Sequence, residues 1–122
     1  MKFAFSTLGC PDWDWRDILS VAYDFKYNGI EIRGLGRELY APRINILQPE
    51  TLPETQRKLN ELNLELSCLT SAVYLFDKSN RDQMLDMGRA YIDTAAHVGI
   101  GNVRVMGDLT PQPSPDIDVD YV

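Results

Sequence analysis

Charged side chains alternate with branched apolar side chains in two short segments of this sequence. Glu31 and Arg33 alternate with isoleucines, and Arg104 lies between two valines. A carboxylate placed in this way can orient a hydroxyl group or transfer a proton, and a guanidinium group can bind a phosphate or carboxylate through two parallel hydrogen bonds. The structural alternative is an internal ion pair between Glu31 and either arginine, because buried charges need partners.

Two further polar residues stand at positions where a ligand could bind. Thr70 ends one apolar segment, and Asp108 follows another. We therefore count Thr70 and Asp108, together with Arg33 and Arg104, as candidate substrate-binding residues. Glu31 is the candidate catalytic residue.

The segments that carry these residues follow two kinds of hydrophobic pattern. Apolar residues at every second position predict strands, and apolar residues at three- and four-residue spacing predict amphipathic helices. Strands and helices alternate, which predicts parallel strands joined by helical crossovers. The predicted strands are 2–6, 30–33, 64–70 and 102–106; the predicted helices begin at 15, 51 and 80 and stop at 28–29, 63 and 98; the longest loops are 34–49 and 71–79.

Alternation along the strands predicts which side chains the helices cover. The isoleucines of the second strand and the valines of the fourth would face the helices, leaving the charged residues on the other face. A doubly wound sheet needs two apolar faces, and no GxGxxG turn follows the first strand. The predicted fold class is α/β, a partial (β/α)₈ TIM barrel with four parallel strands and three helices. On the third strand, Leu64, Leu66 and Cys68 are expected toward the helices, and Glu65, Ser67 and Leu69 away from them.

Composition excludes several classes of function. The net charge of −6 argues against a nucleic-acid partner, because proteins that bind the phosphate backbone concentrate lysine and arginine on one face. No apolar run approaches the roughly 20 residues that span a bilayer, and no signal-peptide pattern is present, so we expect a cytoplasmic protein with no membrane partner. Cys10 and Cys68 suggest neither a zinc site nor a disulfide framework. His97 ends a helix, where it favours the helix dipole, and one histidine cannot form a histidine-rich metal site.

Several motifs in order resemble one known family. FSTLGCP at 5–11 precedes a tryptophan-rich helix start, and NGIEIRG follows at 28–34; LSCLTS at 66–71, YIDTA at 91–95 and VRVMG at 103–107 complete the set. Together they resemble the first half of the xylose isomerase-like TIM-barrel family, the sugar phosphate isomerases and epimerases. The resemblance spans nearly the whole chain.

The resemblance implies a longer parent protein. Its fold is an eight-stranded barrel of about 250 residues, with a divalent metal, Mn, Mg, Co or Zn, held by residues of the later strands. Residues 1–110 would form the N-terminal half of such a barrel, and the acidic, proline-rich tail at 111–122 would be the start of an interrupted fourth helix. We expect this chain to bind no metal by itself.

The implied function is isomerisation or epimerisation of a sugar or sugar phosphate, by metal-dependent proton transfer in the full-length parent. This chain alone is expected to be inactive. An alternative is a non-catalytic module that binds a sugar or a partner chain. A metal-dependent endonuclease of the same superfamily is disfavoured by the acidic composition and the single histidine. Because a half barrel leaves two strand edges open, we also expect a homodimer formed through those edges.

Overall fold

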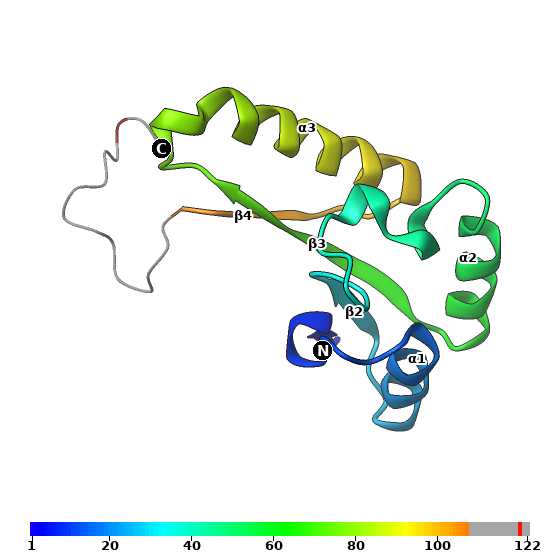
Figure 1. The fold of residues 1–122 in the computed structure, drawn as a ribbon. Helices are drawn as coiled ribbons and strands as arrows, with labels where there is room; N and C mark the ends of the chain where they lie inside the picture. Colours follow the sequence, from blue (N-terminus) through cyan, green and yellow to red (C-terminus); the bar gives the residue numbers. More distant parts are fainter. Residues whose placement is uncertain (108–119, 121–122) are drawn as a thin grey trace.

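The computed structural model describes residues 1–107 and residue 120. In this part of the chain, four strands form one parallel sheet in the order β1-β2-β3-β4, with three α-helices between them. The helices lie on one side of the sheet (Figure 1). The elements are β1 (Ala4–Ser6), α1 (Trp15–Asp24), β2 (Gly29–Ile32), α2 (Leu52–Glu61), β3 (Glu65–Tyr74), α3 (Arg81–Val98) and β4 (Val103–Met106).

The core lies between the sheet and the helices. Ile30 and Ile32 of β2 and Leu69 of β3 are 0% exposed. They pack in one cluster with residues of all three helices, among them Ile18 of α1 and Tyr91 of α3. The predicted alternation on β2 is therefore confirmed. The face that carries Glu31 is the one opposite to the helices.

Each helix is followed, within two residues of its end, by a residue in the left-handed backbone region. The positive φ angles are 60° at Lys26, 53° at Asn63 and 88° at Gly99. After α1, the amide of Tyr27 donates to the Ala22 carbonyl at 2.9 Å, which closes the last turn. The expected stop of the first helix at 28–29 is therefore wrong, because α1 ends at Asp24 and the chain turns at Lys26. Asn28 has another role: its side chain accepts a hydrogen bond from the Phe3 amide at 2.9 Å and ties β1 to β2.

A bulge in β3 reverses the predicted orientation of its side chains. Ile30 is in register with Leu66, but Glu31 is in register with Cys68, so Ser67 is an extra residue in β3. The expectation that Cys68 faces the helices and Leu69 faces away is wrong, because an inserted residue shifts the alternation by one position. The Ser67 carbonyl accepts a hydrogen bond from the Asn102 side chain at 3.1 Å.

Strand β3 also extends beyond its predicted end. It continues to Tyr74, which is in register with Met106 of β4. The predicted loop at 71–79 is wrong in its first part, because pairing with β4 keeps the chain extended there. The Ser71 hydroxyl donates to the Arg104 carbonyl at 2.8 Å and fastens this irregular stretch to β4.

The long connection after β2 is ordered and packs into the core. It contains two short 3₁₀ helices, η2 (Ala41–Arg43) and η3 (Asn45–Leu47). The buried Tyr91 hydroxyl of α3 accepts a hydrogen bond from the Ala41 amide and donates one to the Leu39 carbonyl, both at 3.1 Å. Tyr91 thus holds this connection against α3.

The acidic tail expected at 111–122 lies outside the described residues, apart from Asp120. None of the helices in the described part of the chain combines the length and the apolar run needed to cross a bilayer.

The bulge can be tested by comparing two neighbouring positions of β3. We expect Leu69→Ala to lower the free energy of unfolding by roughly 2–5 kcal/mol, because Leu69 fills the core. Cys68→Ala should lower the free energy of unfolding clearly less, because Cys68 lies on the face opposite to the helices. Urea unfolding followed by circular dichroism measures both. Equal losses, or a larger loss for Cys68→Ala, would contradict the observed register.

Candidate functional site

Glu31 lies at the centre of the face opposite to the helices. The hydroxyls of Ser6 on β1 and Thr70 on β3 donate to the same carboxylate oxygen, Glu31 Oε1, at 3.0 and 2.6 Å. The two donors come from the strands on either side of β2, and the parallel register places Ser6 directly beside Glu31. Two hydroxyl donors fix the orientation of the Glu31 carboxylate.

The second oxygen of Glu31 is available to a ligand. Within the described residues, no hydrogen bond reaches Glu31 Oε2, and none of the ion pairs includes Glu31. The side chain is half-buried. One oxygen is therefore held by two hydroxyl groups, and the other has no hydrogen-bond donor among the described residues.

The arginines are placed differently from each other. Arg104 of β4 is in register with Thr70, so it shares the face of Glu31, and its side chain is exposed. Arg33 donates from Nη1 to the Leu39 carbonyl at 3.4 Å, which directs it toward the connection after β2. In the described structure neither arginine forms the internal ion pair with Glu31 that the sequence left open. Asp108 lies outside the described residues.

The structure thus brings Glu31, Thr70 and Arg104 to one face, while their roles stay predictions. Sequence reasoning missed two neighbours of Glu31. Ser6 could have been found by aligning the ends of the first two parallel strands. Cys68 could not, because only the bulge turns it toward Glu31.

The pKa of the Cys68 thiol is shifted by its surroundings. Burial raises the pKa of Cys68, and the negative charge of the nearby Glu31 carboxylate raises it further. Burial also raises the pKa of Cys10. Both cysteines are free. A raised pKa keeps a thiol neutral and weakly nucleophilic near neutral pH.

Thr7 joins the carboxyl ends of β1 and β2 immediately next to this site. It is 3% exposed. Its hydroxyl donates to the Gly34 carbonyl at 2.6 Å and accepts from the Arg33 amide at 2.9 Å. These bonds fix the end of β2 relative to β1, and so fix the distance from Ser6 to Glu31.

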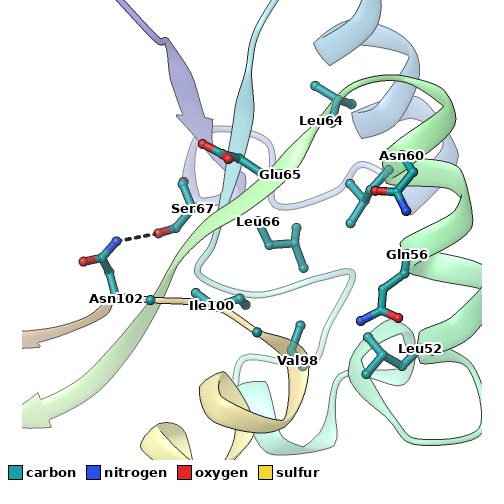
Figure 2. A pocket seen from close by; sticks show the side chains of 13 residues that line it. Leu52, Gln56, Asn60, Leu64, Glu65, Leu66, Ser67, Val98, Ile100 and Asn102 are labelled. Atoms are coloured by element: carbon teal, nitrogen blue, oxygen red, sulfur yellow. Dashed lines mark hydrogen bonds between the residues drawn. The ribbon is translucent and has the colours of Figure 1, made fainter.

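A cavity lies at the opposite end of the strands. It has a volume of about 530 Å³ and lies between α2, the start of β3 and the turn before β4. Figure 2 shows Gln56 and Asn60 of α2 on one side of it and Asn102, bound to Ser67, on the other. Active sites of barrels of this type lie at the carboxyl ends of the strands. We therefore place the candidate site at Glu31 and not in this cavity.

Comparisons with known proteins were made for the whole sequence. No family model and no curated protein matches it. A similar solved structure is described as that of the probable 3-DHS dehydratase AsbF, involved in petrobactin synthesis, from Bacillus anthracis. The two chains share 18% sequence identity and a TM-score of 0.68, over 86% of this chain and 38% of the other.

The chain has the fold of part of a TIM barrel, with four parallel strands and three helices. The fold class predicted from the sequence is thereby confirmed. The half barrel spans less than two fifths of the length of this similar protein, since 38% of that chain is covered. At 18% identity the likeness concerns the fold alone.

The divalent metal implied by the resemblance does not fit the residues present. In the described half barrel, no three histidine, cysteine, aspartate or glutamate side chains lie close enough together to hold a metal ion. Glu31 has hydroxyl groups and a thiol as its neighbours, and hard divalent cations prefer several oxygen ligands with negative charge. We derive no step that involves a metal.

The Thr7 bonds can be tested with two matched substitutions. Thr7→Val should lower the free energy of unfolding by about 1–3 kcal/mol, because it leaves the Arg33 amide and the Gly34 carbonyl without a buried partner. Thr7→Ser keeps the hydroxyl and should retain most of the stability. Urea denaturation of both variants supplies the comparison, and similar losses in the two would show that the methyl group and not the hydroxyl matters.

The proximity of Glu31 and Cys68 predicts a pH effect. The raised pKa predicts that alkylation of Cys68 by iodoacetamide begins at a higher pH than alkylation of a free thiol. Glu31→Gln removes a negative charge, so the alkylation profile should move toward lower pH. Peptide mass spectrometry separates Cys68 from Cys10. Glu65→Gln, at the first residue of β3, is the control, because Glu65 does not contribute to the raised pKa of Cys68. A Glu31→Gln profile identical to that of Glu65→Gln would contradict the proximity.

Proposed function

We propose that this half barrel supplies one side of a sugar isomerase or epimerase site, with Glu31 as its acid–base residue. The arrangement of the Glu31 carboxylate carries the proposal. Ser6 and Thr70 hold Oε1, and Oε2 has no hydrogen-bond donor among the described residues. An oriented carboxylate with one free oxygen can accept a proton or bind a substrate hydroxyl.

The reaction class follows from what such a carboxylate can do on a polyol. Isomerisation moves a proton between a carbon and its oxidised neighbour, and epimerisation removes and returns a proton at one carbon. Both need a base at hydrogen-bond distance from the substrate. The hydroxyl donors keep Glu31 in one orientation, which lowers the entropic cost of positioning it. Polar hydroxyls at the same face suit a ligand that is rich in hydroxyl groups.

Arg104 supports an anionic group on the substrate. It shares the open face with Thr70, and its side chain is exposed. A guanidinium group can bind a phosphate with two parallel hydrogen bonds. A sugar phosphate would then be held at its phosphate by Arg104 and at a hydroxyl by Glu31. Because the half barrel lacks a site for the family's metal within its described residues, we expect it to bind substrate without converting it.

The test is a titration of the ¹⁵N-labelled chain with ribulose 5-phosphate and with free ribulose. We expect saturable shifts of amide signals near Glu31, Thr70 and Arg104, with tighter binding of the phosphate. Glu31→Gln should weaken binding by about tenfold, the loss expected for one hydrogen bond to a charged group. Glu65→Gln is the matched control.

The possible results of this titration distinguish the proposed function from its alternatives. Turnover by the chain with added Mn²⁺ would contradict its expected inactivity. Saturable binding that Glu31→Gln leaves unchanged would favour a non-catalytic binding module. Shifts confined to Gln56, Asn60 and Asn102 would move the binding site to the cavity at the other end of the strands. No shifts at all would contradict the proposal.

A further inference from the structure

Positive charge gathers on the connection after β2. Residues 33–48 hold three arginines, Arg33, Arg37 and Arg43, in a chain whose net charge is −6. The single acidic residue of this segment is Glu38, and its carboxylate accepts a hydrogen bond from a backbone amide at 2.8 Å. Within the described residues none of the three arginines forms an ion pair.

Arginines on two of the helices are placed differently. Arg57 of α2 pairs with Glu54 and Glu61. Arg89 of α3 pairs with Asp86. These guanidinium groups meet carboxylates of their own helix. The arginines of the connection keep their charge and their hydrogen-bond donors for another acceptor, and an anionic ligand is the acceptor that a guanidinium binds best.

Two of these guanidinium groups flank one short segment. Arg33 donates from Nη1 to the Leu39 carbonyl at 3.4 Å. The guanidinium carbon of Arg43 lies 5.4 Å from the centre of the Tyr40 ring, next along the chain. A guanidinium group has five N–H donors, and one of them is used at Arg33. Stacking of Arg43 on an aromatic ring leaves the edge of its guanidinium open to an anion.

The connection holds these groups in place before a ligand arrives. Leu35 and Glu38 exchange backbone hydrogen bonds of 3.0 and 3.2 Å, and Arg37 lies in the tight turn between them. Gly36 has a φ of 60° there. A Cβ atom at Gly34 would lie 3.0 Å from the Glu38 carbonyl oxygen, so this close return of the chain favours glycine. A fixed loop loses little conformational entropy when it binds a ligand.

The connection begins beside the candidate site. Arg33 follows Glu31 by two residues, so its backbone lies up to about 7 Å further toward the carboxyl ends of the strands. Arg104 lies two strands from Glu31, which is roughly 10 Å across the sheet. Positive charge therefore lies on two sides of Glu31, along its own strand and across the sheet.

We propose that Arg33 and Arg43 form a second anion-binding subsite, and that the substrate is a sugar phosphate with a further anionic group, a phosphate or a carboxylate. The inference rests on the proposed function, in which Arg104 binds one phosphate and Glu31 binds a hydroxyl. An open-chain sugar would then be held at both ends, with its middle carbons at Glu31. Arg37 adds positive potential at the second end.

The test compares three ligands by isothermal titration calorimetry of the chain. They are ribulose 5-phosphate, ribulose 1,5-bisphosphate and 6-phosphogluconate, which carries a carboxylate in place of the second phosphate. We expect at least one of the two doubly anionic ligands to bind about tenfold more tightly than the monophosphate, the gain expected for one further hydrogen bond between charged groups. The tighter of the two identifies the second group as phosphate or carboxylate.

Removal of the two guanidinium groups should abolish this preference. In the double variant Arg33→Gln and Arg43→Gln, the doubly anionic ligands should bind no more tightly than the monophosphate, whose own affinity should stay unchanged because Arg104 remains. Arg16→Gln on α1 is the matched control, since Arg16 is exposed and forms no ion pair among the described residues. It should keep the preference. Circular dichroism confirms folding, and Arg43→Gln alone should reduce the preference if the double variant does not fold.

Glu31→Gln separates this inference from the proposed function. It should weaken all three ligands alike and keep the preference for the second anionic group. Monophosphate binding that depends on Glu31, with no preference for either doubly anionic ligand, would overturn the inference and leave the proposed function intact. A preference that the double variant keeps, or that Arg16→Gln loses equally, would also overturn it. If none of the three ligands binds, both proposals are wrong.

Discussion

One-sided burial of the sheet is the constraint on which the rest of the structure depends. Because all three helices pack on one face, Ile30 and Ile32 are fully buried there, and Glu31 between them must face the other side. A shift of β2 by one residue would place a carboxylate in the core and two isoleucines in the polar face. The burial of these isoleucines therefore holds the candidate site in place, although neither of them touches it.

The polar face is assembled from the irregular parts of the sheet as much as from its regular parts. The bulge at Ser67 turns Cys68 and Thr70 toward Glu31 and Leu69 into the core. Without it, Glu31 would lose the donor on β3 and a leucine would stand beside its carboxylate. Bulges are common next to active sites because they redirect side chains without interrupting the sheet. Here the bulge allows a well-packed core on one face of the sheet and a hydrogen-bonded carboxylate on the other.

The likeness to a longer barrel protein bears on the fold and not on the chemistry. Over 86% of this chain the backbone follows that protein with 18% identity, and it covers 38% of it. The half barrel has a carboxylate held by hydroxyl donors, but within its described residues no cluster that could hold a metal ion. The chemistry proposed for this face therefore needs more groups than the described residues supply.

The sequence by itself determined the order of strands and helices, the parallel sheet and the outward face of Glu31, because these depend on local hydrophobic periodicity. It did not determine which side chains of β3 face the helices, the extension of β3 to Tyr74 or the end of α1 at Asp24, since none of these depends on a local pattern. The bulge is held by a hydrogen bond from Asn102, which is distant in sequence. The last residues of β3 are held by pairing with β4. Only the tertiary structure decided that Ser6, Thr70 and Cys68 surround Glu31, because their proximity is set by the register between strands.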